Sequence, residues 1–241
     1  MIVCLEGGDA SGKKTQAALL TTALNALGIP TKTWDFPHYQ SISGGVIGRI
    51  LRGETLVVPE REARTWASDI VRDAVNWQDG STSYSTGDLA KSWSLDKGHI
   101  IQGMMLVDRL EQIDMLIDHA GEDENDKILV LDRYILSAYV YGQADGLELS
   151  WLEATHRVLP QANLTFLLDI SVDESKKRRP ERLDYYERDF EKLERVRMLY
   201  KSEIIKRNSD DTDIGRYFIL DGAAPLEQIT NDILHFIAKS R

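Results

Sequence analysis

Short apolar runs and longer amphipathic stretches alternate along most of the chain. Five apolar runs have the length and composition of buried strands; they are residues 2–5, 32–36, 127–132, 164–170 and 217–220. Between them, apolar residues recur every three or four positions, which predicts helices; these are residues 13–27, 43–52, 98–119, 134–143, 150–159, 185–206 and 225–239. Strands that alternate with helices favour a parallel sheet covered on both faces. The pattern therefore predicts an α/β fold with a five-stranded parallel sheet.

Residues 55–97 interrupt this alternation. Apolar residues between Ala63 and Val75 have helical spacing, which predicts one amphipathic helix. The polar run QDGSTSYSTGD, residues 78–88, predicts a loop after it. Packing against the main domain is the simplest role for the three tryptophans of this block, Trp66, Trp77 and Trp93. We therefore expect a single domain over residues 1–241 with an inserted helix-plus-loop block at about 55–97.

Composition excludes several classes of protein. The chain has 241 residues and a net charge of -10, which argues against a protein that coats nucleic acid, since phosphate contacts need a basic surface. Its one cysteine, Cys4, excludes an intramolecular disulfide and a multi-cysteine zinc site, and its apolar neighbours indicate a buried structural thiol. No run is long enough to span a membrane, and no secretory signal is visible. We expect the protein in a reducing cytosol, away from membranes.

The first predicted strand leads into a glycine-rich loop, EGGDASGKKTQ. Gly7, Gly12 and Lys13 have the spacing of a phosphate-binding loop, and the loop lies between a strand and a helix, as such loops do. Backbone N–H groups from Ser11 to Lys14 would point into the loop, and the helix N-terminus adds positive charge. The sequence therefore predicts a polyphosphate site in which Lys13 bridges the β- and γ-phosphates.

Lys14 stands where such a loop normally has Ser or Thr, and Thr15 comes one residue late. An ammonium group has no lone pair for a metal. Mg²⁺ would then be held by phosphate oxygens, water and carboxylates, in keeping with its tendency to retain water. Lys14 itself is either a second cation near the phosphates or a solvated lysine.

Five segments together resemble the thymidylate kinase family of nucleoside monophosphate kinases. The segments are LEGGDASGKKTQ (5–16), FPHY (36–39), VDR (107–109), VLDRYILSAYVY (130–141) and DYYERDFEKLERVRMLY (184–200). They occur in the family's order and cover most of the chain outside residues 55–97. A basic residue after the loop lysine also occurs in some members, so Lys14 is a tolerated variant by this resemblance.

The resemblance implies a phosphate-loop NTPase fold and transfer of the γ-phosphoryl group of ATP, with Mg²⁺, to a deoxynucleoside monophosphate, most simply dTMP. The acceptor phosphate has a second pKa near 6 and is largely a dianion at neutral pH, so no strong general base is needed. Catalysis then depends on holding two anions in line and neutralising the charge on the transferring group. The site must therefore be rich in cations.

For the ATP side, the resemblance assigns the loop residues Gly7, Gly8, Asp9, Ala10, Ser11, Gly12, Lys13, Lys14 and Thr15. The basic run ESKKRRPER (174–182) resembles a lid, at about residues 173–184, that closes over ATP. The family places its key arginine in the loop or in the lid. The loop position here is Ala10, so the role passes to Arg178, Arg179 or Arg182.

For the metal and the acceptor phosphate, the resemblance implies that Asp9 organises Mg²⁺ and the arginines on the acceptor side. Asp132 ends an apolar strand, where a carboxylate commonly meets Mg²⁺ through water. Arg133 would clamp the acceptor phosphate, for which a bidentate guanidinium is well shaped. Together with the lid arginines, Asp9, Lys13 and Arg133 are the expected catalytic residues.

The expected acceptor residues are Phe36, Tyr39, Met105, Arg109, Arg133, Tyr141 and Tyr186. Three positions depart from the family: Met105 replaces the Phe that stacks on thymine, Ala138 replaces a polar base-contacting residue, and His38 replaces an arginine. Met105 and Ala138 leave open whether the acceptor is dTMP or another deoxypyrimidine monophosphate. Lys14 and the block at 55–97 leave open a third possibility, a nucleotide-binding regulatory protein with weakened catalysis.

The resemblance also implies a homodimer through helices beside the acceptor site, a role that residues 98–119 fit. The block at 55–97 immediately precedes this helix. We expect it either to extend the dimer contact or to cover the acceptor pocket.

Overall fold

A five-stranded parallel sheet forms the centre of the protein. In this computed structural model the residues described are 1–52, 56–59, 81–84, 97–120, 127–179, 190–209 and 215–241. The strands are β1 (Ile2–Glu6), β2 (Thr31–Asp35), β5 (Ile128–Asp132), β6 (Leu164–Asp169) and β7 (Arg216–Asp221). Their order across the sheet is β2-β5-β1-β6-β7, and every neighbouring pair is parallel. The predicted fold class is confirmed, and each strand agrees with its prediction to within one residue at either end.

The central strand, β1, is buried along its whole length. Because side chains alternate across a strand, Ile2 and Cys4 belong to one core cluster, and Val3 and Leu5 belong to the cluster on the opposite face. Burial, with the nearby Glu6 carboxylate as the second cause, raises the pKa of the Cys4 thiol. The interpretation of Cys4 as a buried structural thiol is thus confirmed.

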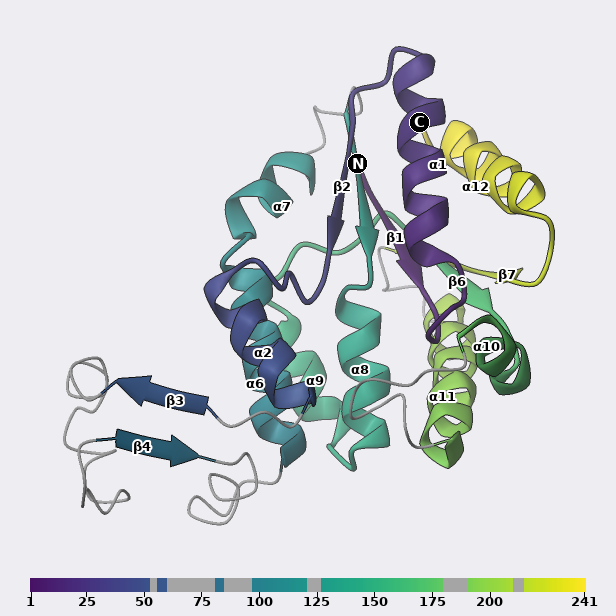
Figure 1. The fold of residues 1–241 in the computed structure, drawn as a ribbon. Coiled ribbons are helices and arrows are strands. Elements are labelled where there is room, and N and C mark those ends of the chain that lie inside the picture. The colour runs from purple at the N-terminus through teal and green to yellow at the C-terminus, as the bar shows by residue number, and fades with distance from the viewer. Residues whose placement is uncertain (53–55, 60–80, 85–96, 121–126, 180–189, 210–214) are drawn as a thin grey trace.

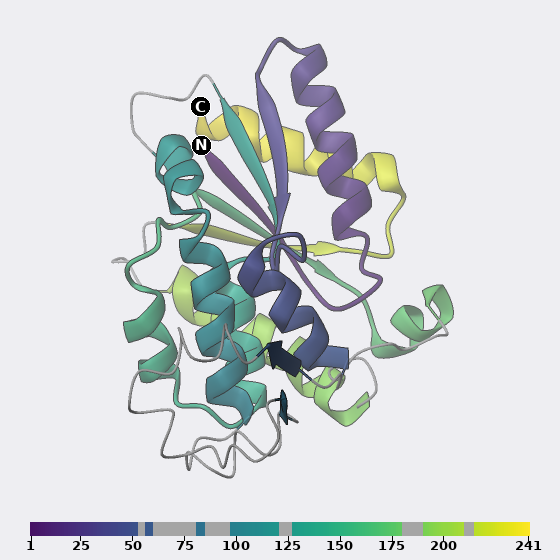
Figure 2. The ribbon, with the colours of Figure 1, turned by 60° about the vertical axis from the view of Figure 1, so that its left-hand side comes forward.

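Helices cover both faces of the sheet (Figures 1 and 2). One face carries α1 (Lys13–Ala26) and α12 (Leu226–Ser240), which pack on each other. The other face carries α2 (Ile42–Arg52), α6 (Lys97–Leu110), α7 (Ile113–Ala120), α8 (Ile135–Ala144), α9 (Leu149–His156) and α11 (Phe190–Asn208). A further helix, α10 (Val172–Arg178), follows β6 within the predicted lid. Ser171 caps α10 by accepting a hydrogen bond from the Glu174 N–H.

Two expectations are corrected. The helix predicted over residues 98–119 is two helices, α6 and α7, because a tight turn closes at its middle, where the Gln112 N–H donates to the Arg109 carbonyl at 3.1 Å. No Gly or Pro marks that turn. Residues Ser81–Tyr84, predicted as part of a loop, form β4, which pairs antiparallel with β3 (Leu56–Pro59).

The polar composition of Ser81–Tyr84 did not indicate a strand, because alternating Ser and Thr with a Tyr occur both in turns and in extended strands. The helix predicted between Ala63 and Val75, the three tryptophans of the block and the first residues of the predicted 185–206 helix lie outside the described residues.

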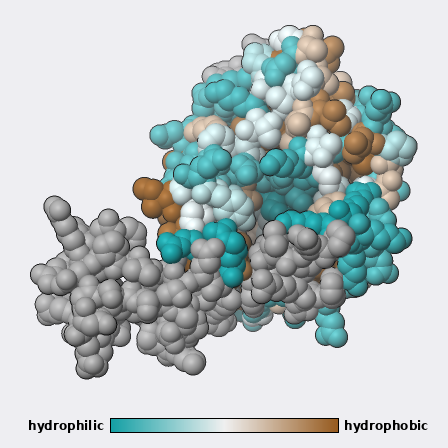
Figure 3. All heavy atoms as spheres, in the orientation of Figure 1, coloured by the Kyte–Doolittle hydropathy of each residue, from teal (hydrophilic) through white to brown (hydrophobic). Residues whose placement is uncertain are grey.

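The surface in the orientation of Figure 1 is mostly hydrophilic or neutral, with hydrophobic patches that are separate from one another (Figure 3). None of the helices in the described segments has the length and apolar character that a membrane span requires.

A buried carboxylate connects β1, α8 and α11. Glu6 has no exposed surface, and its Oε1 accepts hydrogen bonds from the N–H groups of Tyr134 (2.9 Å) and Ser137 (3.1 Å). Its Oε2 accepts from the hydroxyls of Ser137 (2.5 Å) and Tyr200 (3.0 Å). The N-cap residue of α8, Tyr134, provides no side-chain cap of its own. Glu6 therefore caps α8 from the neighbouring strand, where a negative charge complements the helix dipole.

We expect Glu6→Gln to lower the free energy of unfolding by about 3 kcal/mol, because an amide N–H₂ would face donors where the carboxylate accepts. Urea unfolding followed by circular dichroism measures this change. Glu227→Gln, at an exposed glutamate in the first turn of α12, is the matched control, with a cost below about 1 kcal/mol. Equal unfolding midpoints for the two variants would contradict the capping role of Glu6.

Candidate active site

The phosphate loop connects β1 to α1, and its backbone requires glycine. Gly7 has φ 142°, and a Cβ there would lie 2.7 Å from the Leu168 carbonyl oxygen, so a side chain has no room. Gly12, with φ 97°, precedes the first residue of α1. The loop therefore holds its N–H groups at the helix N-terminus, an arrangement suited to phosphate.

Lys13 folds back across this loop. Its Nζ donates to the carbonyl oxygens of Gly7 (3.1 Å) and Gly8 (2.8 Å). Burial, and secondly the positive charge of Arg133, lower the pKa of Lys13 to about 8. An anion in the loop would favour the charged ammonium, so ligand binding and protonation of Lys13 are coupled.

We expect ATP affinity to fall as the pH rises above about 8, by up to about tenfold per pH unit, because the ligand-free loop then holds a neutral Lys13 that must take up a proton to bind phosphate. Below pH 8 the lysine is already charged, and the affinity stays level. Calorimetry at pH 7 and pH 9, in buffers of different ionisation enthalpy, measures both the dissociation constant and the protons taken up.

In this test, Lys13→Met should bind ATP weakly and without the pH dependence. Lys239→Met, at an exposed lysine in the last turn of α12, is the control and should retain it. Equal wild-type affinities at the two pH values, without proton uptake, would contradict the coupling.

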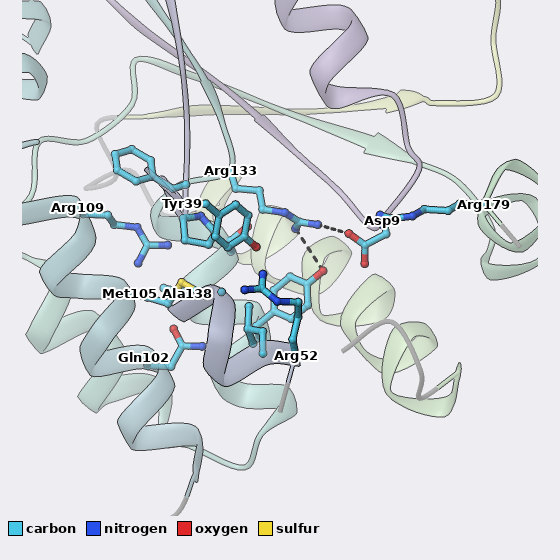
Figure 4. Close-up of a pocket in the computed structure, with 15 residues that line it drawn as sticks. Asp9, Tyr39, Arg52, Gln102, Met105, Arg109, Arg133, Ala138 and Arg179 are labelled. Carbon is cyan, nitrogen blue, oxygen red and sulfur yellow. Dashed lines mark hydrogen bonds and ion pairs between the residues drawn. The ribbon is translucent and has the colours of Figure 1, made fainter. Parts of the chain in front are cut away.

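Arg133 joins the phosphate loop to the far end of β5. Its Nη2 donates to Asp9 Oδ1 at 2.7 Å, and its Nη1 donates to the Tyr141 hydroxyl at 3.2 Å (Figure 4). Nη1 also donates to the Gly7 carbonyl at 3.0 Å. The backbone of Arg133 has φ 67°, which is unfavourable for a residue with a side chain. The Arg133 N–H donates to the Leu5 carbonyl at 2.9 Å, which helps to hold this conformation. The guanidinium is thus fixed before any ligand binds.

A cavity of about 340 Å³ opens beside Arg133, and we call it the acceptor pocket. The residues lining it that were predicted as site residues are Asp9, Phe36, Tyr39, Met105, Arg109, Arg133, Tyr141 and Arg179. The others are Pro37, Gly48, Leu51, Arg52, Gln102, Ser137 and Ala138. They come from the phosphate loop, the ends of β2 and β5, three helices and the end of α10 (Figure 4). The fold therefore brings together the expected acceptor residues that the structure describes, which are all but Tyr186.

Hydrogen bonds to Asp108 of α6 hold the segment after β2 in place. This fully buried carboxylate accepts hydrogen bonds from the His38 N–H (2.9 Å) and the Ser41 hydroxyl (2.7 Å). Gly44 permits the close approach, since a Cβ there would lie 1.9 Å from the His38 carbonyl oxygen. These contacts hold Tyr39 at the pocket.

His38 does not line the acceptor pocket. Its ring stacks on Trp34 at 4.2 Å, and its Nδ1 lies 3.2 Å from Asp35. Arg52, one turn after Gly48 on α2, does line the pocket and points into it (Figure 4). The sequence analysis did not identify Arg52 as a site residue. The only signal at this position is a basic residue four positions after Gly48.

At the inner end of the pocket, Phe36 is buried and stacks on Tyr134 at 5.6 Å. Arg109 donates to the Tyr134 carbonyl at 2.9 Å, and its Nη1 lies 3.3 Å from Nε2 of His156. Burial, and secondly Arg109, lower the pKa of His156 to about 4, so its ring is neutral. With Nδ1 donating to the Leu152 carbonyl, Nε2 is free of a proton and accepts from Arg109.

The lid helix contacts the phosphate loop from the other side. Ser175 donates to the Asp9 carbonyl at 2.7 Å, and Nη1 of Arg178 donates to the carbonyls of Ala10 (3.3 Å) and Gly222 (3.1 Å). Arg179 instead lines the acceptor pocket near Asp9 (Figure 4). Arg182 and Tyr186 lie outside the described residues, and so do residues 180–184 of the predicted lid.

Carboxylate oxygens are the metal donors that the described residues of this site offer. Within the segments that the structure describes, no group of three or more His, Cys, Asp or Glu residues could hold a metal ion. Lys14 and Thr15 are exposed. Asp132 ends β5, and Asp9 lies in the loop that follows the adjacent strand, β1. Their carboxylates fit a hard cation that keeps water and phosphate oxygens as its other ligands.

A family model described as thymidylate kinase matches residues 96–233, more than half of the chain. The chain belongs to the thymidylate kinase family. A probable thymidylate kinase of Pyrococcus abyssi is 28% identical over 240 residues, which cover 98% of this chain and 94% of that relative. One of Metallosphaera sedula is 33% identical over 119 residues, which cover 48% of this chain and 56% of that relative.

A solved structure of a thymidylate kinase from Candida albicans matches with a TM-score of 0.67 at 21% sequence identity. The match covers 99% of this chain and 91% of that chain. The likeness shows the fold, a phosphate-loop NTPase fold, over nearly the whole length.

Proposed function

We propose that the protein transfers the γ-phosphoryl group of ATP to dTMP, giving ADP and dTDP. The observation that carries this proposal is the position of Arg133. Its guanidinium bonds Asp9 and Gly7 of the phosphate loop and lines the acceptor pocket, whose volume of about 340 Å³ suits a nucleotide. One cation therefore serves both the donor and the acceptor side of a transfer between two phosphates.

An acceptor oxygen attacks Pγ, the bond from Pγ to the bridging oxygen breaks, and ADP leaves. The acceptor is already a dianion, so the protein's task is to hold it in line and to neutralise charge. Arg133, Arg52 and Tyr39 line the acceptor pocket, which supports their binding of the acceptor phosphate. Lys13 and the loop N–H groups bind the phosphates of ATP, and Arg179 lines the pocket near Asp9, which supports a role for it at the transferring group.

We propose Mg²⁺ as the metal of this site, held by phosphate oxygens and water with Asp9 and Asp132 nearby. Bound there, Mg²⁺ supplies positive charge to the phosphates. The exposed position of Lys14 supports both roles considered for it, a second cation near the phosphates and a solvated side chain.

The regulatory alternative is not favoured. A site kept only for binding would not need the acceptor pocket, yet Arg133, Arg109 and Arg179 all line it. The names of the relatives favour dTMP over another deoxypyrimidine monophosphate as the acceptor.

A coupled assay of ADP release with ATP and Mg²⁺ tests the function against dTMP, dUMP, dCMP, dAMP, dGMP and UMP. We expect the highest kcat/KM with dTMP. Preference for another nucleotide would keep the transfer and change the substrate, and no ADP release with any of the six would overturn the proposed function.

In the same assay, Arg133→Ala should lower kcat/KM at least about a hundredfold, since it removes a charge placed at both phosphates. Arg157→Ala, at an exposed arginine that ends α9, is the matched control and should keep wild-type turnover. Wild-type turnover in Arg133→Ala would remove that residue from the site.

We further propose that the protein is in the cytosol, as expected from its composition. We also propose that it forms a homodimer through α6 and α7. Val107, Leu110 and Ile117 on these helices are 44%, 39% and 58% exposed, which supports an interface there. Sedimentation should give twice the chain mass of 27.3 kDa, and Val107→Asp should shift it toward the single chain. A wild-type mass of one chain at micromolar concentration would contradict the dimer.

A further inference from the structure

Gln102 is a buried side chain in the acceptor pocket with an unused acceptor. It is 2% exposed and lines the cavity. Its amide oxygen, Oε1, has no hydrogen-bond partner among the residues that the structure describes. A buried polar atom left without a partner costs about 1–3 kcal/mol. A donor on a bound ligand can satisfy such an atom beside a pocket, since the amide turns easily about its last side-chain torsion.

The position of Gln102 relates it to the base of the acceptor. Gln102, Met105 and Arg109 are three and four residues apart, so they share one face of α6. Figure 4 shows the three side chains one after another along this wall of the pocket, with Ala138 beside Met105. Arg133 lies at the opposite, phosphate end of the cavity. A nucleotide with its phosphate at Arg133 would place its base along this wall.

Thymine presents an N3–H donor between two carbonyl acceptors, O2 and O4. Arg109 has only donors and can bind a carbonyl oxygen, but it has nothing to accept the N3–H. Ala138 has no polar side-chain atom, and the Met105 thioether is a weak acceptor. The Ser137 hydroxyl is already bonded to Glu6 and Tyr200. On this wall, the strong side-chain acceptor without a partner is Oε1 of Gln102.

We propose that Gln102 accepts the N3–H of the acceptor's base and so selects a pyrimidine that carries both N3–H and a 4-carbonyl, as thymine and uracil do. Arg109 provides the other half of the selection, because its donors oppose the 4-amino group of cytosine. The glutamine thus takes the place of the polar side chain absent at Ala138. This inference rests on the proposed function, since it assigns the base end of the same pocket.

The test compares wild-type protein and Gln102→Leu, each with dTMP and with its N3-methyl derivative, by calorimetry. Leucine has nearly the volume of glutamine, so the steric cost of the methyl group is similar in both proteins and only the hydrogen bond differs. We expect N3-methylation to weaken wild-type binding about tenfold more than it weakens binding to Gln102→Leu. In turnover, Gln102→Leu should raise KM for dTMP about tenfold and leave kcat within about threefold.

Thermal unfolding separates this role from a structural one. Because the substitution removes a buried amide oxygen that lacks a partner, Gln102→Leu should have a Tm equal to or above that of the wild type. Gln112→Leu, the same change in the turn between α6 and α7 and outside the pocket, should leave the effect of N3-methylation as in the wild type.

The outcomes are distinguishable. If the wild type binds dTMP and N3-methylation weakens both proteins equally, the role of Gln102 is overturned while the proposed function stands. A lower Tm with unchanged discrimination would likewise make Gln102 a structural residue. If the wild type binds neither ligand, both the role of Gln102 and the proposed function are overturned.

Discussion

The buried Glu6 carboxylate is the interaction on which the site depends. It ends the central strand, caps α8 through the N–H groups of Tyr134 and Ser137, and accepts from Tyr200 of α11. Burial, and secondly Glu6 itself, raise the pKa of Tyr200 well above its usual range, so the phenol remains a donor. A buried anion satisfied by this many donors admits few other arrangements of these elements. It therefore fixes where α8 begins, and the residue just before the N-cap of that helix, Tyr134, is Arg133.

Arg133 transmits this constraint to the phosphate loop. Its guanidinium bonds Asp9 and Gly7, and its charge is the second cause of the lowered pKa of Lys13. Two cations are thus held close together before any phosphate arrives, at a cost that burial increases. Anionic ligands relieve that cost, which is the electrostatic reason for a site that binds two phosphates. When no anionic ligand is bound, the negative charge of Asp9 offsets part of the repulsion between Lys13 and Arg133.

The acceptor pocket shows how a site diverges locally while its fold is kept. His38 packs on Trp34, away from the cavity, and Arg52 of α2 supplies a cation at the pocket instead. At the base end, Ala138 offers no polar atom, and Gln102 brings an unused acceptor to the same wall. In each case the group at the pocket comes from a different segment of the chain, because several segments surround one cavity and any of them can supply the chemistry.

The sequence by itself determined the sheet, most helices and the phosphate loop, because buried strands, amphipathic helices and glycine spacing are local patterns. Two features could not be predicted from the sequence, the turn that divides α6 from α7 and the strand β4, since neither has a Gly, Pro or apolar signal of its own. Only the tertiary structure decided that Glu6 caps α8, that Arg179 reaches the pocket, and that Arg52 and Gln102 line it. Those contacts join residues far apart in the chain, and no local pattern encodes which distant side chains will meet.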